Sequence, residues 1–169
     1  EPTEDLRPLV ADWAAQLDIL LLQPGINQRV AAARNLGLAQ ASAPIVALCD
    51  DDDRWLPWHL QQTHDALVSS GADLVCAAAD VVQVARGEPQ AVARRPFAFL
   101  PDGEFLARWN TMPPSCLVYR RALHQQLGGF DETLPHYADW DWALRVCRAG
   151  AAMKLSMPVS VEIRFDLAG

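Results

Sequence analysis

Apolar and polar residues alternate along the chain in blocks that predict strands and helices in turn. Apolar runs at 18–23 (DILLLQ) and 44–49 (PIVALC) predict two buried strands, and a third strand is predicted within 73–84. Asn27 is expected to cap a helix between the first two strands, and Leu56-Pro57 opens another helix after the second. Strands that alternate with helices are typical of a largely parallel sheet covered by helices.

The N-terminal segment predicts a helix that begins near Thr3, because acidic residues follow where the helix dipole favours them. This helix is expected to turn four apolar residues inward: Leu6, Leu9, Val10 and Trp13.

The second half of the chain continues the mixed pattern. The predicted elements are a loop or short hairpin at 85–101, a short helix capped by Asp102, a strand at 115–119, a helix at 121–127 stopped by Gly128-Gly129, a helix at 138–149, and two short strands near Met153 and Val161.

Length and composition limit the class of protein. A chain of 169 residues is the size of one domain, and 51% apolar residues exclude a disordered chain. The net charge of -7, with no basic patch, argues against a nucleic-acid partner. No apolar run approaches the roughly 20 residues of a membrane span, so a cytoplasmic location is expected, in solution or at the cytoplasmic face of a membrane. The four cysteines have no metal-binding spacing and are expected to be buried thiols of a reducing compartment.

Four consecutive aspartates, Asp50 to Asp53, follow the predicted strand at 44–49. An acidic run is most often only a solvated loop, but ligands of open α/β sheets bind beyond the carboxyl ends of strands. Adjacent carboxylates repel, and oxygen ligands without His or Cys suit Mg²⁺ or Mn²⁺. In extended backbone Asp50 and Asp52 would share a face, so we expect these two to hold the cation.

Two further acids lie in the predicted helix at 138–149. Asp141 is expected to pair with Arg145 in a surface ion pair, one turn further on. Asp139 instead lies on the apolar face of that helix, where partial burial would raise its pKa toward that of a useful base. The other interpretation is that Asp139 merely caps the helix, and geometry alone leaves both open.

Two long stretches of the chain together resemble glycosyltransferase family 2. They are AARNLGLAQASAPIVALCDDDDRWLPWHL (32–60) and CLVYRRALHQQLGGFDETLPHYADWDWALRVCRAG (116–150). The family shows a similar order: an ARN-G helix, an apolar strand, an aspartate run with W-x-P, a GGFDE segment, and an acidic pair opening a helix. The resemblance implies a GT-A fold, an α/β Rossmann-like sheet that is mostly parallel and flanked by helices.

The same resemblance implies a metal-dependent enzyme that transfers a sugar from a nucleotide-diphosphate donor to an acceptor hydroxyl with inversion. Asp50 and Asp52 match the DxD pair that holds Mn²⁺ or Mg²⁺. Arg34, Asp50 and Asp51 are the residues expected on the nucleotide side, although a structural pairing of Arg34 with a nearby acid is at least as good an interpretation. Asp139 matches the catalytic base.

The sequence departs from the family in three places. Ala138 occupies the position where the family usually has Glu before the base. Asp166 stands where a His often completes the metal site. The family's β-α-β portion, which binds the nucleoside base of the donor, has no counterpart here. We therefore expect a single N-terminally truncated domain over 1–169, with an exposed sheet edge that favours a homodimer.

A non-catalytic relic of the same fold, binding a sugar or a partner protein, is the alternative to an enzyme. Ala138 and the absence of the family's N-terminal β-α-β portion favour the relic, whereas Asp139 and the intact aspartate run favour the enzyme. A nucleotidyltransferase on a similar sheet would be expected to show a glycine-rich phosphate loop, which this sequence lacks. The acceptor stays open among a saccharide, a lipid-linked molecule and a protein.

Overall fold

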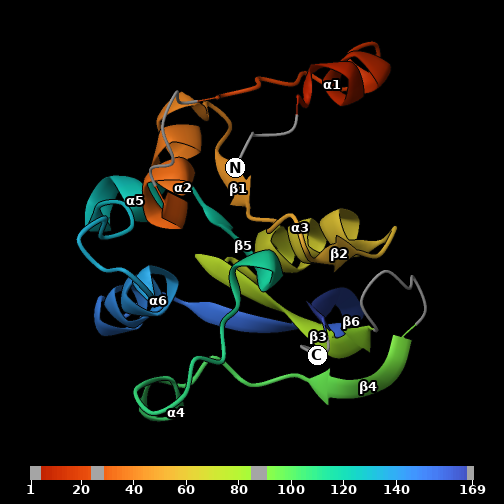
Figure 1. Ribbon diagram of the computed structural model, residues 1–169. Coiled ribbons are helices and arrows are strands. Elements are labelled where there is room, and N and C mark those ends of the chain that lie inside the picture. Colours follow the sequence, from red (N-terminus) through yellow and green to blue (C-terminus); the bar gives the residue numbers. More distant parts are fainter. Residues whose placement is uncertain (1–4, 24–28, 85–90, 167–169) are drawn as a thin grey trace.

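A six-stranded mixed sheet forms the centre of the computed structural model, which describes residues 5–23, 29–84 and 91–166 (Figure 1). The strand order is β1-β5-β3-β6-β2, and β4 pairs with β3 outside this order. The strands are β1 (Ile45–Ala47), β2 (Arg54–Trp55), β3 (Leu74–Val84), β4 (Ala91–Phe97), β5 (Leu117–Arg120) and β6 (Met153–Asp166).

Helices surround this sheet, and Figure 1 shows α2, α5 and α6 grouped together beside it. The helices are α1 (Arg7–Trp13), α2 (Arg29–Gln40), α3 (His59–Ser70), α4 (Gly103–Leu106), the 3-10 turn η1 (Pro114–Cys116), α5 (Ala122–Leu127) and α6 (Ala138–Arg148). The largest buried side chain is Trp142 of α6, which packs in one core cluster with Tyr119 of β5 and Leu74 of β3.

The α/β class is confirmed, but the expectation of a mostly parallel sheet is wrong for the described strands. Only β3 and β6 run parallel, while β1–β5, β3–β5, β3–β4 and β2–β6 are antiparallel. A strand buried on both faces reads as a continuous apolar run whichever way its neighbour points. The apolar runs therefore predicted where strands occur and left their direction undetermined.

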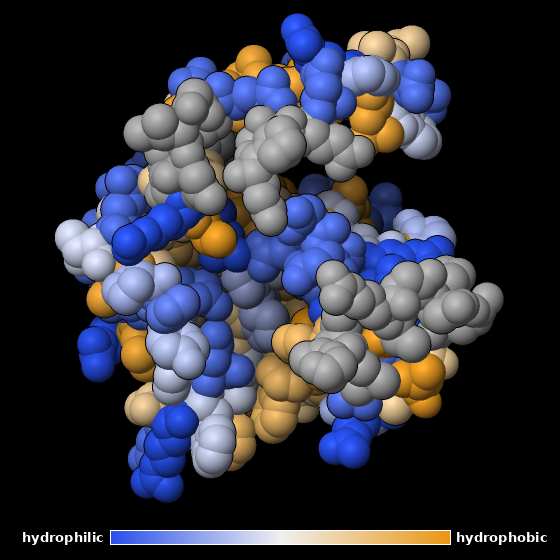
Figure 2. All heavy atoms as spheres, in the orientation of Figure 1, coloured by the Kyte–Doolittle hydropathy of each residue, from blue (hydrophilic) through white to orange (hydrophobic). Residues whose placement is uncertain are grey.

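The N-terminal segment differs most from its prediction. Helix α1 buries none of its residues, and three of its expected inward residues are exposed: Leu6, Leu9 and Trp13. Residues 18–23 form no strand, and Leu20 is 64% exposed. An apolar run becomes a strand only when its backbone groups find a partner, and none of the described strands pairs with it. Figure 1 shows α1 standing away from the sheet, and Figure 2 shows apolar spheres on its surface.

Most other elements lie where they were predicted. The 85–101 region does contain one arm of a hairpin, since β4 pairs antiparallel with β3. Asp102 caps α4 by accepting the backbone N–H groups of Glu104 and Phe105, both at 3.0 Å. The two short strands predicted near the end are instead the single strand β6, whose pairing with β3 shifts register between Ala77 and Ala79.

One prediction, the cap at Asn27, falls outside the described residues. The helix that was predicted to begin near Thr3 begins instead at Arg7, with Leu6 at its N-cap position. Among the helices that the structure describes, none is long and apolar enough to cross a bilayer.

Candidate functional site

The acidic run forms a turn at the carboxyl end of β1. The backbone N–H of Asp53 donates to the carbonyl of Asp50 at 3.2 Å, and Asp51 and Asp52 are exposed at the tip. The extended backbone from which we inferred a shared face for Asp50 and Asp52 is therefore not found. Figure 1 places this loop between β1 and α3, and hydrophilic spheres gather there in Figure 2.

Ser115, which is fully buried, holds both ends of this acidic turn. Its hydroxyl accepts the backbone N–H of Asp50 at 2.9 Å and donates to the Asp53 carboxylate. The Asp53 carboxylate also accepts the backbone N–H of Arg164 at 3.1 Å. Burial raises the pKa of Asp53 above its usual value, with these two hydrogen bonds acting in the opposite direction. The indole of Trp55 donates to the Ser115 carbonyl at 2.8 Å, so the turn is tied to η1 from three directions.

Arg34 of α2 pairs with the first aspartate of the turn. Its Nη2 atom lies 2.6 Å from Oδ1 of Asp50, and the Arg34 side chain is only 16% exposed. The guanidinium also lies over the ring of Phe130, 5.6 Å from the centroid. The structural pairing of Arg34 with a nearby acid is thus confirmed, and its role on the nucleotide side stays a prediction.

The donor atoms for a cation are oxygens. Among the described residues no group of three or more His, Cys, Asp or Glu side chains converges on one point. The side chain of Asp166, expected as a further ligand, lies outside the described residues. Cation binding by Asp50 and Asp52 therefore stays a prediction, and it agrees with the chemistry of Mg²⁺, which binds one or two carboxylates and keeps waters or substrate phosphates as its other ligands.

The four cysteines are not uniformly buried as expected. Cys76 and Cys116 are buried, Cys147 is half-buried, and Cys49 is exposed beside the acidic turn. Desolvation by the surrounding protein and the neighbouring carboxylates raise the pKa of Cys49 to about 11, so its thiol is protonated at neutral pH.

Asp139 lies in the first turn of α6 and is half-buried. The interpretation that it caps the helix is wrong, because Tyr137 occupies the cap position and no side chain caps there. Instead, Oδ2 of Asp139 accepts the side-chain amide of Asn110 at 3.0 Å. The rest of its helix face is apolar and fully buried, as predicted: Trp142, Ala143 and Val146.

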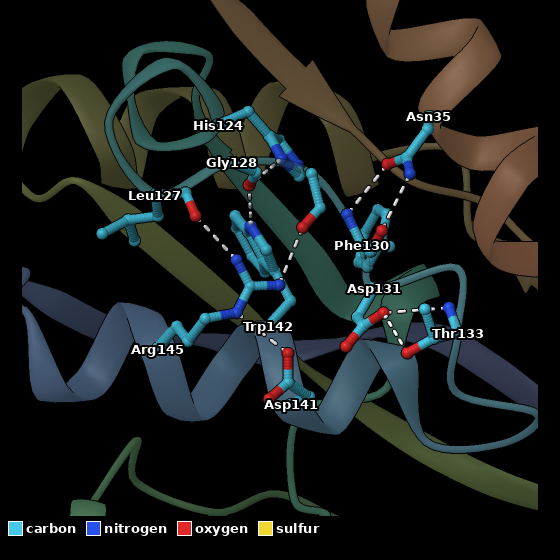
Figure 3. A network of polar contacts seen from close by, with 11 residues as sticks. Asn35, His124, Leu127, Gly128, Phe130, Asp131, Thr133, Asp141, Trp142 and Arg145 are labelled. Atoms are coloured by element: carbon cyan, nitrogen blue, oxygen red, sulfur yellow. Dashed lines mark hydrogen bonds and ion pairs between the residues drawn. The ribbon is translucent and has the colours of Figure 1, made fainter.

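The predicted ion pair between Asp141 and Arg145 is confirmed at 2.9 Å. The same guanidinium also binds two backbone carbonyls (Figure 3). Its two terminal nitrogens donate to the carbonyls of Leu127 and Gly129, each at 2.7 Å. The guanidinium therefore closes the turn that joins α5 to the GGFDE segment.

Asn35, the neighbour of Arg34, holds the same segment from the other side. Its side-chain amide donates to the carbonyl of Phe130 and accepts the N–H of Phe130, both at 2.8 Å (Figure 3). A Cβ at Gly129 would collide with this amide, which explains why a glycine stands there. The ARN helix and the GGFDE segment, far apart in sequence, are thus two halves of one contact.

One short segment links the acidic turn with Asp139. Asn110 contacts Asp139, and Ser115 contacts Asp50. The five residue steps between Asn110 and Ser115 extend over roughly 17 Å at most. Sequence reasoning missed both Asn110 and Ser115. Neither belongs to a recognisable motif, and their partners lie 29 and 65 residues away in the chain, so no local pattern reveals them.

Comparisons with known proteins agree with this fold and identify its family. A family model described as Glycosyl transferase family 2 matches residues 2–128. The uncharacterized glycosyltransferase YwdF of Bacillus subtilis is 35% identical over 135 residues, which is 79% of this chain and 50% of that protein. The amylovoran biosynthesis glycosyltransferase AmsE of Erwinia amylovora is 22% identical over 162 residues, 96% of this chain and 60% of that protein. The chain thus spans about half the length of these relatives.

Solved structures of TarS from S. aureus share the fold. A crystal structure of TarS 1-349 aligns with a TM-score of 0.73 and 20% identity, covering 96% of this chain and 48% of that chain. The same protein in complex with UDP-GlcNAc aligns with a TM-score of 0.74 and 18% identity, over 99% of this chain and 48% of that one.

Proposed function

Since the chain belongs to glycosyltransferase family 2, we propose that it carries the donor and catalytic site of an inverting, metal-dependent glycosyltransferase. One observation supports this proposal above the others. The acidic turn and Asp139, which the family assigns to donor and base, are bound to opposite ends of one six-residue segment, Asn110 to Ser115.

On the donor side, Asp50 and Asp52 would hold Mn²⁺ or Mg²⁺, and Arg34 and Asp51 would lie beside the nucleotide. Arg34 fixes one oxygen of Asp50, which orients the other oxygen for a ligand. When bound, the cation would neutralise the charge that develops on the diphosphate leaving group. A nucleoside diphosphate sugar is the expected donor, and UDP-GlcNAc, which TarS binds, is the first to test.

On the acceptor side, Asp139 takes the proton of the attacking hydroxyl. The hydroxyl oxygen forms a bond to the anomeric carbon while the bond from that carbon to the β-phosphate oxygen breaks, and its electron pair leaves with the nucleoside diphosphate. Attack from the face opposite the leaving group inverts the anomeric centre. Asn110 occupies Oδ2 of Asp139, so Oδ1 is the atom we assign to the proton.

The test is Asp139→Asn in the full-length protein. The measurement is the release of UDP from UDP-GlcNAc with MnCl₂, with and without acceptors, while calorimetry follows donor binding. General-base catalysis contributes about 10²- to 10⁴-fold, so turnover should fall by that order with donor affinity unchanged. Asp141→Asn, two residues away, is the matched control and should keep the native rate. A native rate in Asp139→Asn would contradict the assignment of Asp139 as the base, whereas donor binding without turnover in the native protein would favour the non-catalytic alternative.

A further inference from the structure

The buried segment from Asn110 to Ser115 contacts both groups of carboxylates on which the proposed function depends. Its first residue donates to Asp139, and its last residue accepts from Asp50 and donates to Asp53. These carboxylates belong to a loop and a helix that are far apart in sequence. Their relative placement therefore depends on what lies between them.

At the Ser115 end, a single hydroxyl uses its lone pair and its proton at once. It accepts from the backbone of Asp50 and donates to the side chain of Asp53, so its rotation is fixed by both partners. Because Ser115 is fully buried, water cannot replace either bond. The exposed tip of the turn, Asp51 and Asp52, is thereby held between two anchored residues.

At the Asn110 end, the orientation of the amide is also fixed. Its Oδ1 atom accepts the backbone N–H of Met112 at 3.4 Å, which directs its NH₂ group toward Asp139. A hydrogen bond to one carboxylate oxygen restricts the side-chain rotation of Asp139. It also leaves the other oxygen as the one available to an acceptor hydroxyl.

The segment between these ends is buried and stiff. Thr111 is 3% exposed, and Met112 is 1% exposed. Pro113 and Pro114 fix two backbone angles, and the carbonyl of Pro113 accepts the N–H of Cys116 at 3.0 Å. A stiff segment keeps the distance between Asp139 and the acidic turn constant, whereas a flexible loop would let the two groups move independently.

We propose that Asn110 and Ser115 are positioning residues, which set the base and the donor-side acidic turn at a fixed separation. This inference rests on the proposed function and adds a division of labour within it. Asn110 affects the reacting step through Asp139, and Ser115 affects donor binding through the turn. Removal of a hydrogen-bond partner in the outer shell of a site typically costs about 10- to 100-fold in affinity or activity.

The experiment measures UDP release from UDP-GlcNAc with MnCl₂ in the full-length protein carrying Asn110→Leu or Ser115→Ala. For Asn110→Leu we expect kcat to fall at least about tenfold with KM for the donor unchanged. For Ser115→Ala we expect the donor KM, and the calorimetric Kd of Mn²⁺ with UDP, to rise about tenfold with kcat within a factor of about three. Asn110→Gln keeps the amide donor and should recover part of the lost rate. Ser70→Ala, which removes an exposed hydroxyl bound to the Ala66 carbonyl, is the matched control and should change neither constant.

A double substitution separates positioning from mere stability. If Asn110 acts through the base, Asn110→Leu should cause no further loss of kcat in the Asp139→Asn background. Urea unfolding of each variant shows whether it is folded under the assay conditions. Variants that lower stability but leave kcat and KM native would overturn the proposal, as would equal changes of both constants in both variants. A native rate in Asn110→Leu alongside an inactive Asp139→Asn would overturn this inference alone, whereas a native rate in Asp139→Asn would overturn the proposed function.

Discussion

Two polar regions of this chain contain the motifs that resemble the family, and they differ in how their polar groups are used. Around Asn35 and Arg145, the side-chain amide and the guanidinium form hydrogen bonds with backbone groups of the same chain (Figure 3). In the acidic turn, Asp51 and Asp52 are exposed at the tip of a loop whose two ends are anchored. A polar motif whose hydrogen-bond donors and acceptors find partners within the chain stabilises the fold. One that is anchored but leaves oxygens exposed is available to a ligand.

The largest expected effect tests the region around Asn35 and Arg145, which we call the closed region because its polar groups bind one another. Arg145→Met keeps the length of the side chain but removes the bonds to Leu127, Gly129 and Asp141. Hydrogen bonds from charged groups contribute about 1.5–3 kcal/mol each when buried and less when partly exposed, so we expect a loss of about 3 kcal/mol in unfolding free energy. Donor affinity should not change while the protein is folded.

Urea unfolding at pH 7 measures this loss. Arg148→Met, at an exposed position three residues further along the same helix, is the control and should cost less than about 0.5 kcal/mol. A loss below about 1 kcal/mol for Arg145→Met would show that the network does not stabilise the fold as described.

The next effect tests the acidic turn, which we call the open region because Asp51 and Asp52 are exposed at its tip. Asp52→Asn removes one carboxylate charge from an exposed position, and no packing is lost. We expect the affinity for Mn²⁺ with UDP to fall by about 10- to 100-fold, which corresponds to one lost charge-assisted bond. The free energy of unfolding should stay level or rise slightly, because the repulsion among neighbouring aspartates decreases. Asp12→Asn in α1 is the control carboxylate, and equal affinity in Asp52→Asn and the native protein would remove the cation from this turn.

The same contrast explains how far sequence reasoning could reach. The strands β1 and β3, the helix α6 and the Asp102 cap were predicted because their signals are local: apolar runs, helical spacing and a capping residue. The run at 18–23 has the same local signal as β1, and it is no strand, because a strand also needs a neighbour that the run itself does not encode. Strand direction in the sheet was mispredicted for the same reason.

In the candidate site, the charged residues could be predicted from the sequence, but the residues that hydrogen-bond to them could not. Asp50, Asp52 and Asp139 stand in recognisable contexts, whereas Asn110 and Ser115 gain their importance from contacts across 29 and 65 residues of chain. The acidic turn was also expected to be extended, since nothing local indicates the hydrogen bond from Asp53 to Asp50.

A smaller effect concerns pH and a buried histidine outside both regions. His59 is fully buried against Trp55, and burial lowers its pKa from 6.5 to about 4. Its folded pKa is below its unfolded value, so it contributes stability above pH 6.5 that is lost as pH falls toward 4. Between pH 7 and pH 5 this linkage amounts to about 2 kcal/mol.

Urea unfolding at both pH values measures the difference. His59→Gln should reduce the pH dependence, and His64→Gln, at an exposed position of the same helix, should leave it unchanged. An unaltered dependence in His59→Gln would show that this histidine does not contribute to it.

The smallest effect defines the boundary of the closed network. Asp141 is 37% exposed, and its pairing with Arg145 joins residues four apart on one helix. Such pairs contribute about 0.3–0.5 kcal/mol, because solvent screens the charges and two long side chains lose freedom. In Asp141→Asn the amide oxygen still accepts from Nε of Arg145, and the guanidinium keeps both carbonyls. We therefore expect a loss of at most about 0.5 kcal/mol in urea unfolding, against about 3 kcal/mol for Arg145→Met. A loss above about 1.5 kcal/mol would mean that the carboxylate belongs to the network and that its charge, rather than the two carbonyls, holds the guanidinium in place.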